Sequence, residues 1–212
     1  MGEATIYGPA YSTYARTARL VLEEKGAAYK LVEVDILKGD GQSPAHLARS
    51  PFGKVPAVEL DGFTLYETGA IERFLDDAVP GAKLTPADPK QRARMNQIMG
   101  IVDNYIYQPA VHGVAINRLV KPMLGDKPDE AAIAKALPEA GKALTAIESL
   151  IGQNDYLAGP QVSLADLHLA PVVAYFAMTP EGEAVLKNLP KLSGWWARMK
   201  DRPSMTKTAP KF

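Results

Sequence analysis

Two short segments of the sequence carry groups that could hold a peptide-like ligand. Val55-Pro56 comes directly before a predicted strand, where a cis peptide bond would turn the Val55 backbone N–H and C=O outward. Glu67-Thr68 stands between a predicted strand and a predicted helix. The Thr68 hydroxyl and the free N–H groups of that first turn could bind a carboxylate, while Glu67 could hold an ammonium group. A ligand with an amino acid head and an extended peptide body would fit both segments.

Ser12 supplies a hydroxyl where another predicted helix begins. The hydroxyl, the first-turn N–H groups and the positive helix end would surround one point and could stabilise a thiolate there. A free thiol has a pKa of about 8.5, so it is mostly protonated at neutral pH and gains reactivity from such stabilisation. Because the chain contains no cysteine, the substrate must supply the sulfur if thiol chemistry takes place here.

Each of these residues also has a plain structural interpretation. Ser12 and Thr68 are common helix caps, and Pro56 can simply begin a strand. Tyr7, at the end of the first predicted strand, is the main rival of Ser12 as the group that activates the thiol. Residue types alone leave these alternatives open.

Composition and missing motifs narrow the classes of function. The chain of 212 residues is 47% hydrophobic, and its 24 basic side chains balance its 24 acidic ones, so we expect no nucleic acid partner and no acidic membrane. The three histidines, His46, His112 and His168, lack partners at ligand spacing, so we expect no metal site. Nucleophile-elbow, phosphate-loop and dinucleotide motifs are absent. The N-terminus lacks a signal-peptide pattern, and no apolar run is long enough to span a bilayer, so we expect a cytoplasmic protein.

The first part of the chain predicts a mixed α/β domain. A strand-helix-strand unit favours parallel pairing, and the Asp61-Gly62 turn predicts an antiparallel hairpin. The expected strands are residues 4–7, 29–36, 57–60 and 63–66, with a helix after Ser12 that ends near Gly26, a short helix near 45–49 and a helix around 70–75.

The second part of the chain predicts helices alone. Proline and glycine are concentrated between Pro80 and Pro89, so we predict domain 1–80, linker 81–88 and domain 89–212. One long helix is expected to begin at Asp88-Pro89 and to bend near Pro109. A second is expected over residues 129–151, although Pro138 makes its continuity doubtful. A third should follow residue 163, and a last one should contain Trp195. Ser163 and Asp166 have the spacing of a capping box and are interpreted as structural.

Several of these segments together resemble the glutathione transferases, most closely the serine-type phi class and its bacterial relatives. The resemblance covers nearly the whole chain. It is carried by Gly8-Pro9-Ala10-Tyr11-Ser12, Glu24-Lys25-Gly26, Pro51-Phe52-Gly53-Lys54-Val55-Pro56, Leu65-Tyr66-Glu67-Thr68, Ser163-Leu164-Ala165-Asp166, Leu189-Pro190-Lys191-Leu192, and Trp195-Trp196 through Arg202-Pro203.

The resemblance implies a thioredoxin-like first domain with a four-stranded mixed sheet, an all-helical second domain and a homodimer. It implies that Ser12 bonds the glutathione sulfur, that Val55 pairs with the cysteinyl backbone, and that Glu67 with Thr68 holds the γ-glutamyl head. Lys54 would lie near the glycyl end. Glutathione would be a co-substrate, with neither metal nor redox cofactor.

The sequence departs from the phi pattern at the glycyl end of the ligand. A His-Lys pair often holds the glycyl carboxylate there, but this chain has Gly41-Gln42, so the contact is weakened or moves to Gln42 and Lys54. Gly69, where a larger residue is usual, has no functional explanation.

The identity of the second substrate stays open at this point. A mostly apolar electrophile is expected in a cleft between the domains, with a wall that could include Tyr11, Tyr105, Tyr107, Val111, His112 and Ile116. Peroxidase, dehalogenase and isomerase reactions share the activated thiolate, and a non-catalytic carrier is the alternative from another class. Phe52, between Pro51 and Gly53, is expected to project into the second domain of a partner subunit.

Overall fold

The computed structural model describes residues 2–210, and these form two compact units. The first unit contains the chain up to Thr85 together with the described residues from Arg202 onward, and the second unit is Pro86–Asp201. Each unit buries apolar side chains of its own.

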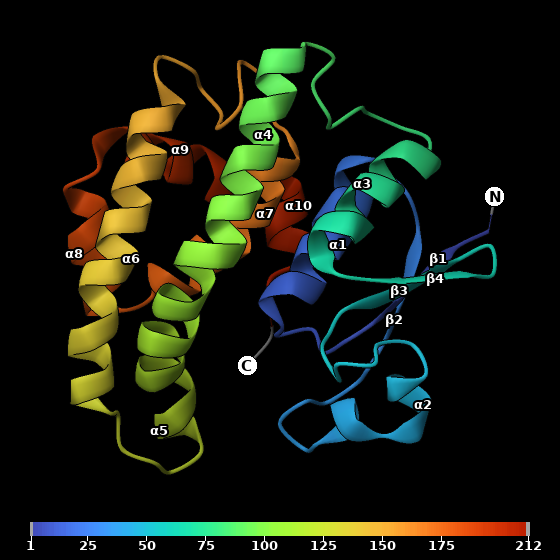
Figure 1. The fold of residues 1–212 in the computed structure, drawn as a ribbon, viewed down its shortest axis with the longest axis horizontal. Helices are drawn as coiled ribbons and strands as arrows, with labels where there is room; N and C mark the ends of the chain where they lie inside the picture. The colour runs from blue at the N-terminus through green and yellow to red at the C-terminus, as the bar shows by residue number, and fades with distance from the viewer. Residues whose placement is uncertain (1, 211–212) are drawn as a thin grey trace. The chain divides into compact units, whose positions relative to one another are not determined.

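A four-stranded mixed sheet forms the centre of the first unit. Its strand order is β2-β1-β3-β4, in which β1 and β2 are parallel and the other two pairs are antiparallel. The helices α1 and α3 pack against each other on one side of the sheet, and α2 lies on the other side (Figure 1). The elements are β1 (Ala4–Tyr7), α1 (Thr13–Glu24), β2 (Tyr29–Val32), η1 (Asp40–Gln42), α2 (Pro44–Leu47), β3 (Ala57–Leu60), β4 (Phe63–Tyr66), α3 (Thr68–Ala78) and α10 (Pro203–Lys207). The predicted fold class of this domain is therefore confirmed.

Local signals in the sequence explain most of these boundaries. Gly26 ends α1 in the left-handed conformation that glycine adopts without strain, with φ 67°. Asp61 and Gly62 also have positive φ, 51° and 80°, as the predicted hairpin between β3 and β4 requires. Ile6 of β1 and Leu20 of α1 are completely buried between the layers. The apolar pattern of the sequence and its turn residues thus both agree with the observed elements of this unit.

The second strand is shorter than predicted, because it ends at Val32 and not at residue 36. The Asp35 carboxylate accepts hydrogen bonds from the Tyr11 hydroxyl (2.8 Å) and from the Leu37 N–H (3.1 Å). A carboxylate that bonds the backbone two residues on forms a turn, and the turn takes Ile36 out of the sheet into an exposed position.

The second unit is all-helical, which confirms the second half of the predicted fold class. Its elements are α4 (Pro89–Ile101), η2 (Val102–Val120), α5 (Lys121–Met123), α6 (Glu130–Ile151), α7 (Leu164–Phe176), α8 (Pro180–Lys187) and α9 (Pro190–Lys200). Asp88 caps α4 by accepting hydrogen bonds from the backbone of Lys90 and Gln91, as Asp88-Pro89 predicted. The helix α6 continues through Pro138 without a break.

The segment η2 is a π-helix and contains Pro109, where the sequence analysis expected a bend. Proline has no N–H to donate, and the wider π-turn is one of the ways in which a helix accommodates an interrupted ladder. η2 packs closely on α6, since a Cβ added at Gly113 would collide with the Ala136 side chain. Glycine at 113 therefore allows the two helices to approach.

Asp166 ties three parts of the second unit together and is completely buried. Its carboxylate accepts hydrogen bonds from the backbone N–H and hydroxyl of Ser163 (both 2.8 Å), the Leu157 N–H (2.9 Å) and the Trp195 indole N–H (2.8 Å). Burial raises the pKa of Asp166, and the bonds from Leu157, Ser163 and Trp195 act in the opposite direction. The predicted capping box is present, and it also anchors the loop before α7 and the helix α9.

The division into units differs from the predicted domains at the C-terminal end. Residues from Arg202 onward, assigned by sequence to the helical domain 89–212, belong to the first unit. The Arg202 guanidinium forms two hydrogen bonds to the Glu24 carboxylate (2.9 and 2.5 Å), and the Ser204 hydroxyl donates a third (2.5 Å). Burial alone would raise the pKa of Glu24, but these bonds outweigh it and lower the pKa. The segment is therefore fastened to the end of α1.

The predicted linker 81–88 also begins within the first unit, which extends to Thr85. The buried Asp76 carboxylate pairs with Lys25 (3.2 Å) and accepts the backbone N–H groups of Leu84 (2.9 Å) and Thr85 (3.0 Å). Lys25 in turn donates to the Ala82 carbonyl (3.0 Å). This buried ion pair fixes the chain well beyond residue 80.

Candidate functional site

The register of the sheet gathers the predicted site residues of the first unit at one edge. Ala57 pairs with Tyr7 on one side and with Tyr66 on the other, so three strand ends lie in one row. Ser12 follows the first of these strands, Val55 precedes the second, and Glu67-Thr68 follows the third. The topology therefore brings together three separate segments, of which Ser12 and Glu67-Thr68 are more than fifty residues apart in sequence.

Val55 presents an unpaired backbone at this edge. The Val55-Pro56 peptide bond is cis, as predicted. Neither the N–H nor the C=O of Val55 forms a hydrogen bond within residues 2–210. Both groups can therefore pair with an added extended peptide in the way that an exposed strand does.

Gly8 allows Val55 to approach the start of α1. A Cβ added at Gly8 would lie 3.0 Å from the Ala15 Cβ and 3.3 Å from the Val55 Cβ. Such contacts are tighter than a side chain at this position tolerates without a shift. Glycine at position 8 therefore brings the first turn of α1 beside the free Val55 backbone.

Ser12 is the N-cap of α1 and is half-buried. Its Oγ accepts a hydrogen bond from the Ala15 N–H (3.3 Å), and its carbonyl accepts one from the Arg16 N–H (2.9 Å). Because Oγ is used here as an acceptor, the hydroxyl proton remains available for donation. Capping and stabilisation of a bound anion are therefore compatible at this residue.

Two tyrosines that precede Ser12 in sequence, Tyr7 and Tyr11, have their hydroxyls bonded to carboxylates. The Tyr7 hydroxyl donates to the Glu59 carboxylate (3.2 Å), and the Arg49 guanidinium lies 4.0 Å from the centre of the Tyr7 ring. The Tyr11 hydroxyl donates to Asp35 (2.8 Å); burial first, and then this bond, raise the pKa of Tyr11 to about 12. Both hydroxyls therefore donate their protons to carboxylates, whereas the Ser12 Oγ acts as an acceptor.

Glu67-Thr68 opens α3 with two donors in a strained turn. Glu67 has φ 70° and ψ 111°, a conformation that costs a non-glycine residue on the order of 1–3 kcal/mol. The N–H groups of Thr68 and Gly69 have no acceptor within the described part of the chain. They lie at the positive end of α3, where a carboxylate is favoured, and the exposed Glu67 side chain stands next to them.

Gln42 lies against the segment that carries Lys54, because a Cβ added at Gly41 would be 2.6 Å from the Gly53 carbonyl oxygen. Gly53 has φ 63°, and a Cβ there would collide with the Gln42 side-chain amide. The two residues proposed to replace the His-Lys pair are thus on neighbouring segments. Both Gln42 and Lys54 are exposed.

His46 supports the same segment and was not singled out as a functional residue by the sequence analysis. It is buried, and its Nε2 lies 2.9 Å from the Lys54 carbonyl oxygen, which is an acceptor, so Nε2 carries the proton in this contact. Gly53 N–H bonds the Ser50 carbonyl (2.9 Å). No local pattern signals these contacts, because their geometry depends on how the loop folds back.

The residues suggested for a second-substrate wall in the second unit differ in exposure. Val111 is buried, whereas Tyr105 is 65% exposed. The Tyr107 and His112 rings make an edge contact with centroids 5.3 Å apart, and burial raises the pKa of Tyr107. Ile116 is half-buried. The role of these residues in a substrate pocket stays a prediction.

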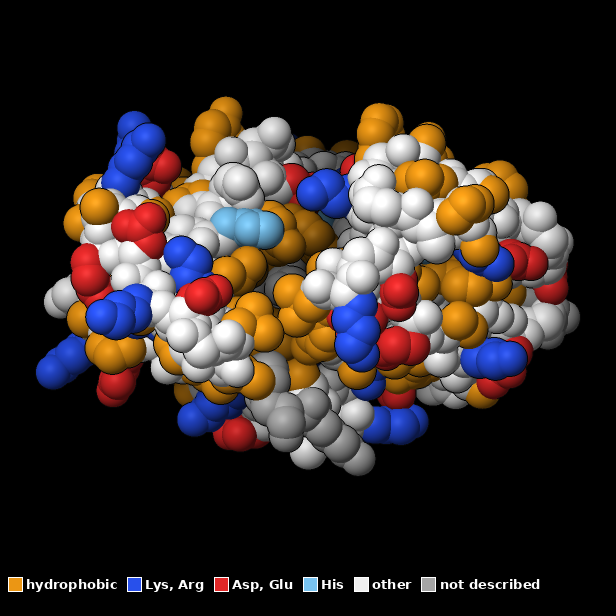
Figure 2. All heavy atoms as spheres, turned by 90° about the horizontal axis from the view of Figure 1, so that it is seen from below, with side chains coloured by type: hydrophobic (Ala, Val, Ile, Leu, Met, Phe, Trp, Pro, Cys, Tyr) orange, Lys and Arg blue, Asp and Glu red, His pale blue; other side chains and the backbone are white. Residues whose placement is uncertain are grey.

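The surface shows charges of both signs. On the face drawn in Figure 2, basic and acidic side chains are interspersed, in keeping with the balanced composition. Among residues 2–210 there is no cluster of side chains that could hold a metal ion. Within the same residues, none of the helices has the length and apolar character needed to cross a bilayer.

The fold and the site together define a class of protein. A thioredoxin-like unit with a free backbone beside a cis-proline, followed by an all-helical unit, is the architecture of the glutathione S-transferases. The family model "Glutathione S-transferase, N-terminal domain" matches residues 11–78, and "Glutathione S-transferase, C-terminal domain" matches residues 107–203.

Individual relatives agree with the family models. The chain is 35% identical to the probable glutathione S-transferase GSTF2 of Oryza sativa, over 99% of this chain and 97% of that protein. It superimposes on glutathione transferase F7 from Populus trichocarpa with a TM-score of 0.87 and 32% identity, covering 97% of each chain. Glutathione S-transferase I from mais, solved with an atrazine glutathione conjugate, gives 0.84 and 28%, covering 98% of this chain and 97% of that one. The chain belongs to the glutathione S-transferase family, and the resemblance to the phi class is confirmed.

Proposed function

We propose that this chain conjugates glutathione to an electrophilic, mostly apolar second substrate. In the reaction the glutathione thiol loses its proton, and the thiolate forms a carbon–sulfur bond while the electrophile releases a leaving group or accepts the electron pair. The observation that carries the proposal is the single sheet edge where Ser12, the free Val55 backbone and the Thr68 N–H gather. The conjugate bound by the mais relative supports it.

Each part of glutathione has a counterpart at that edge. The Ser12 hydroxyl donates to the sulfur, and the Val55 N–H and C=O pair with the cysteinyl backbone. The γ-glutamyl carboxylate accepts hydrogen bonds from the N–H groups at the start of α3 and from the Thr68 hydroxyl, while the Glu67 carboxylate binds the ammonium group. Gln42 and Lys54 face the glycyl carboxylate. In this proposal glutathione is a co-substrate, and the chain's own groups supply the chemistry.

Glu67→Gln should raise the KM for glutathione by about tenfold and leave kcat nearly unchanged. The substitution removes the charge that holds the ammonium group, in the ground state and the transition state alike, and a charge-assisted hydrogen bond contributes about 1.5–3 kcal/mol. The measurement is steady-state kinetics across a panel of electrophiles, with calorimetric titration of glutathione. Asp61→Asn, at the other end of the same hairpin, is the control and should change neither quantity.

This assay also tests the function as a whole. If the unchanged chain binds glutathione saturably but turns over none of the electrophiles, the protein is a non-catalytic carrier and not an enzyme. Turnover of peroxides, or of halogenated or isomerisable substrates only, would select a related glutathione-dependent reaction. Normal glutathione affinity in Glu67→Gln would remove Glu67 from the site.

We also propose a homodimer in which Phe52 enters the partner subunit. Phe52 is 65% exposed and makes an edge contact with Tyr66 at 6.0 Å between ring centroids. Burying such a ring contributes roughly 1.5–3 kcal/mol.

Phe52→Ala should therefore raise the dimer dissociation constant at least about tenfold in sedimentation experiments, because that factor corresponds to roughly 1.4 kcal/mol. Leu37→Ala, which removes another exposed apolar side chain of the first unit, should leave the dimer unchanged. A Phe52→Ala dimer as tight as the original would show that Phe52 packs within its own subunit.

A further inference from the structure

The chain reaches Ser12 through a tight turn whose central peptide is the Ala10-Tyr11 bond. The Ser12 N–H donates to the Pro9 carbonyl (3.0 Å), which closes a four-residue β-turn over residues 9–12. The common turn types differ mainly in which way the central peptide faces. The orientation of the Ala10 carbonyl therefore decides how the turn delivers Ser12 to the start of α1.

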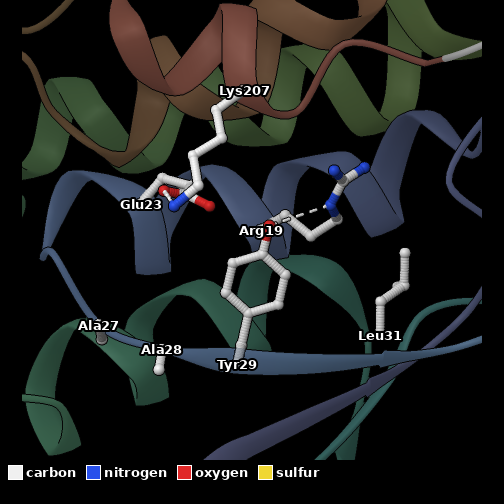
Figure 3. Close-up of a pocket in the computed structure, with 7 residues that line it drawn as sticks. All are labelled: Arg19, Glu23, Ala27, Ala28, Tyr29, Leu31 and Lys207. Carbon is white, nitrogen blue, oxygen red and sulfur yellow. Dashed lines mark hydrogen bonds and ion pairs between the residues drawn. The ribbon is translucent and has the colours of Figure 1, made fainter.

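Arg19 fixes that carbonyl from inside the unit. It lies almost two turns into α1, is buried, and its guanidinium donates to the Ala10 carbonyl (3.4 Å). The same guanidinium donates to the Tyr29 hydroxyl (3.3 Å) and to the Thr208 carbonyl (3.2 Å). Figure 3 shows Arg19 and Tyr29 facing each other. Both residues line a pocket of about 410 Å³. Arg19 thus joins the Ser12 turn to strand β2 and to the C-terminal segment.

The C-terminal segment is itself firmly held, so it can serve as a fixed support for Arg19. Thr208 is completely buried, and its hydroxyl donates to the Ser204 carbonyl (2.8 Å) and accepts from Arg16 (3.3 Å). Arg16 also donates to the Met205 carbonyl (2.9 Å). The Arg16 side chain is buried against α10. Two arginines of α1 therefore bind one segment at the far end of the chain.

We propose that Arg19 is a positioning residue for thiol activation, acting through the Ala10 carbonyl on the turn that carries Ser12. The hydrogen bonds to Thr208 and Tyr29 fix the position of the guanidinium. The guanidinium in turn keeps the turn of residues 9–12 in the orientation that points the Ser12 hydroxyl at the glutathione sulfur. The proposal rests on Ser12 as the thiol-activating group. It makes the reactivity of the site depend on a contact between α1 and the C-terminal segment.

Arg19→Met should raise the pKa of the bound glutathione thiol by about one unit, which leaves up to about tenfold less thiolate at a pH below the pKa of the bound thiol. The pKa is measured from thiolate absorbance in the binary complex and from the pH profile of kcat/KM. The rate deficit should close at high pH, because the thiol then ionises without help. Arg19→Lys should restore part of the effect, and Tyr29→Phe, which removes one support of the guanidinium, should give a smaller shift in the same direction.

The control is Lys207→Ala, on the wall of the same pocket. Lys207 is exposed and pairs with Glu23 (2.7 Å), so its loss leaves the Ala10 contact intact and should leave the thiol pKa unchanged. If Arg19→Met and Tyr29→Phe lower only the melting temperature and keep the original pH profile, Arg19 is merely a packing residue and the inference is wrong. If Ser12→Ala also leaves the thiol pKa unchanged, the assignment of Ser12 has failed as well, and the two failures are thereby told apart.

Discussion

Ser12→Ala is expected to raise the pKa of enzyme-bound glutathione by about two units and to lower kcat/KM by up to about 100-fold at a pH below the pKa of the bound thiol. A shift of this size corresponds to about 2.7 kcal/mol of lost thiolate stabilisation. The alanine removes a hydroxyl donor that stands at the positive end of α1, where the Thr13 N–H also has no acceptor among residues 2–210. The thiolate absorbance of the binary complex and the pH dependence of kcat/KM measure the effect.

Ser12→Ala alone does not separate chemistry from stability, because the Ser12 Oγ also caps α1. Loss of the cap is expected to cost about 0.5–2 kcal/mol of unfolding free energy. Ser12→Asp makes the separation. An aspartate caps a helix as well as a serine does, but its negative charge repels a thiolate. It should therefore keep stability near that of the original chain while abolishing turnover.

Tyr7→Phe is the second comparison. The Tyr7 hydroxyl is bonded to Glu59, so its removal should leave the thiol pKa as it was. The opposite pattern, an intact pKa in Ser12→Ala and a raised one in Tyr7→Phe, would transfer the role to Tyr7.

The features that could be predicted from the sequence are those that depend on neighbouring residues. The hairpin at Asp61-Gly62, the end of α1 at Gly26 and the cap at Asp88 each follow from backbone geometry that a few residue types adopt at low cost. The candidate site could be suggested for a related reason. Its groups are helix starts and an X-Pro bond, which are recognisable in the sequence even though their meeting point is not.

Contacts between distant segments could not be predicted in the same way. The bond between Arg19 and the Thr208 carbonyl spans 189 residues, and a backbone carbonyl carries no signal in the side-chain sequence. The sequence therefore placed residues from Arg202 onward in the helical domain, whereas they pack with the first unit. The positive φ of Glu67 could not be predicted for another reason. This conformation is costly for glutamate, so the propensity of the residue argues against it.

Asp166→Ala is expected to destabilise the second unit by about 3 kcal/mol or more, beyond the range of an ordinary helix cap. The substitution leaves three buried N–H donors without an acceptor, those of Leu157, Ser163 and Trp195. Each unsatisfied buried donor costs about 1–3 kcal/mol, whereas a lost cap costs about 0.5–2 kcal/mol. Chemical denaturation followed by circular dichroism and tryptophan fluorescence measures the loss.

Asp129→Ala is the matched control, because Asp129 caps α6 through one exposed hydrogen bond, to the Ala132 N–H (3.0 Å). It should cost no more than an ordinary cap. Asp166→Asn keeps the volume and one acceptor oxygen, so its loss should lie between the two alanine variants. Equal losses in Asp166→Ala and Asp129→Ala would show that the bonds to Leu157 and Trp195 contribute little. Full stability of Asp166→Ala with lost turnover would instead move Asp166 from the architecture of the second unit into the chemistry.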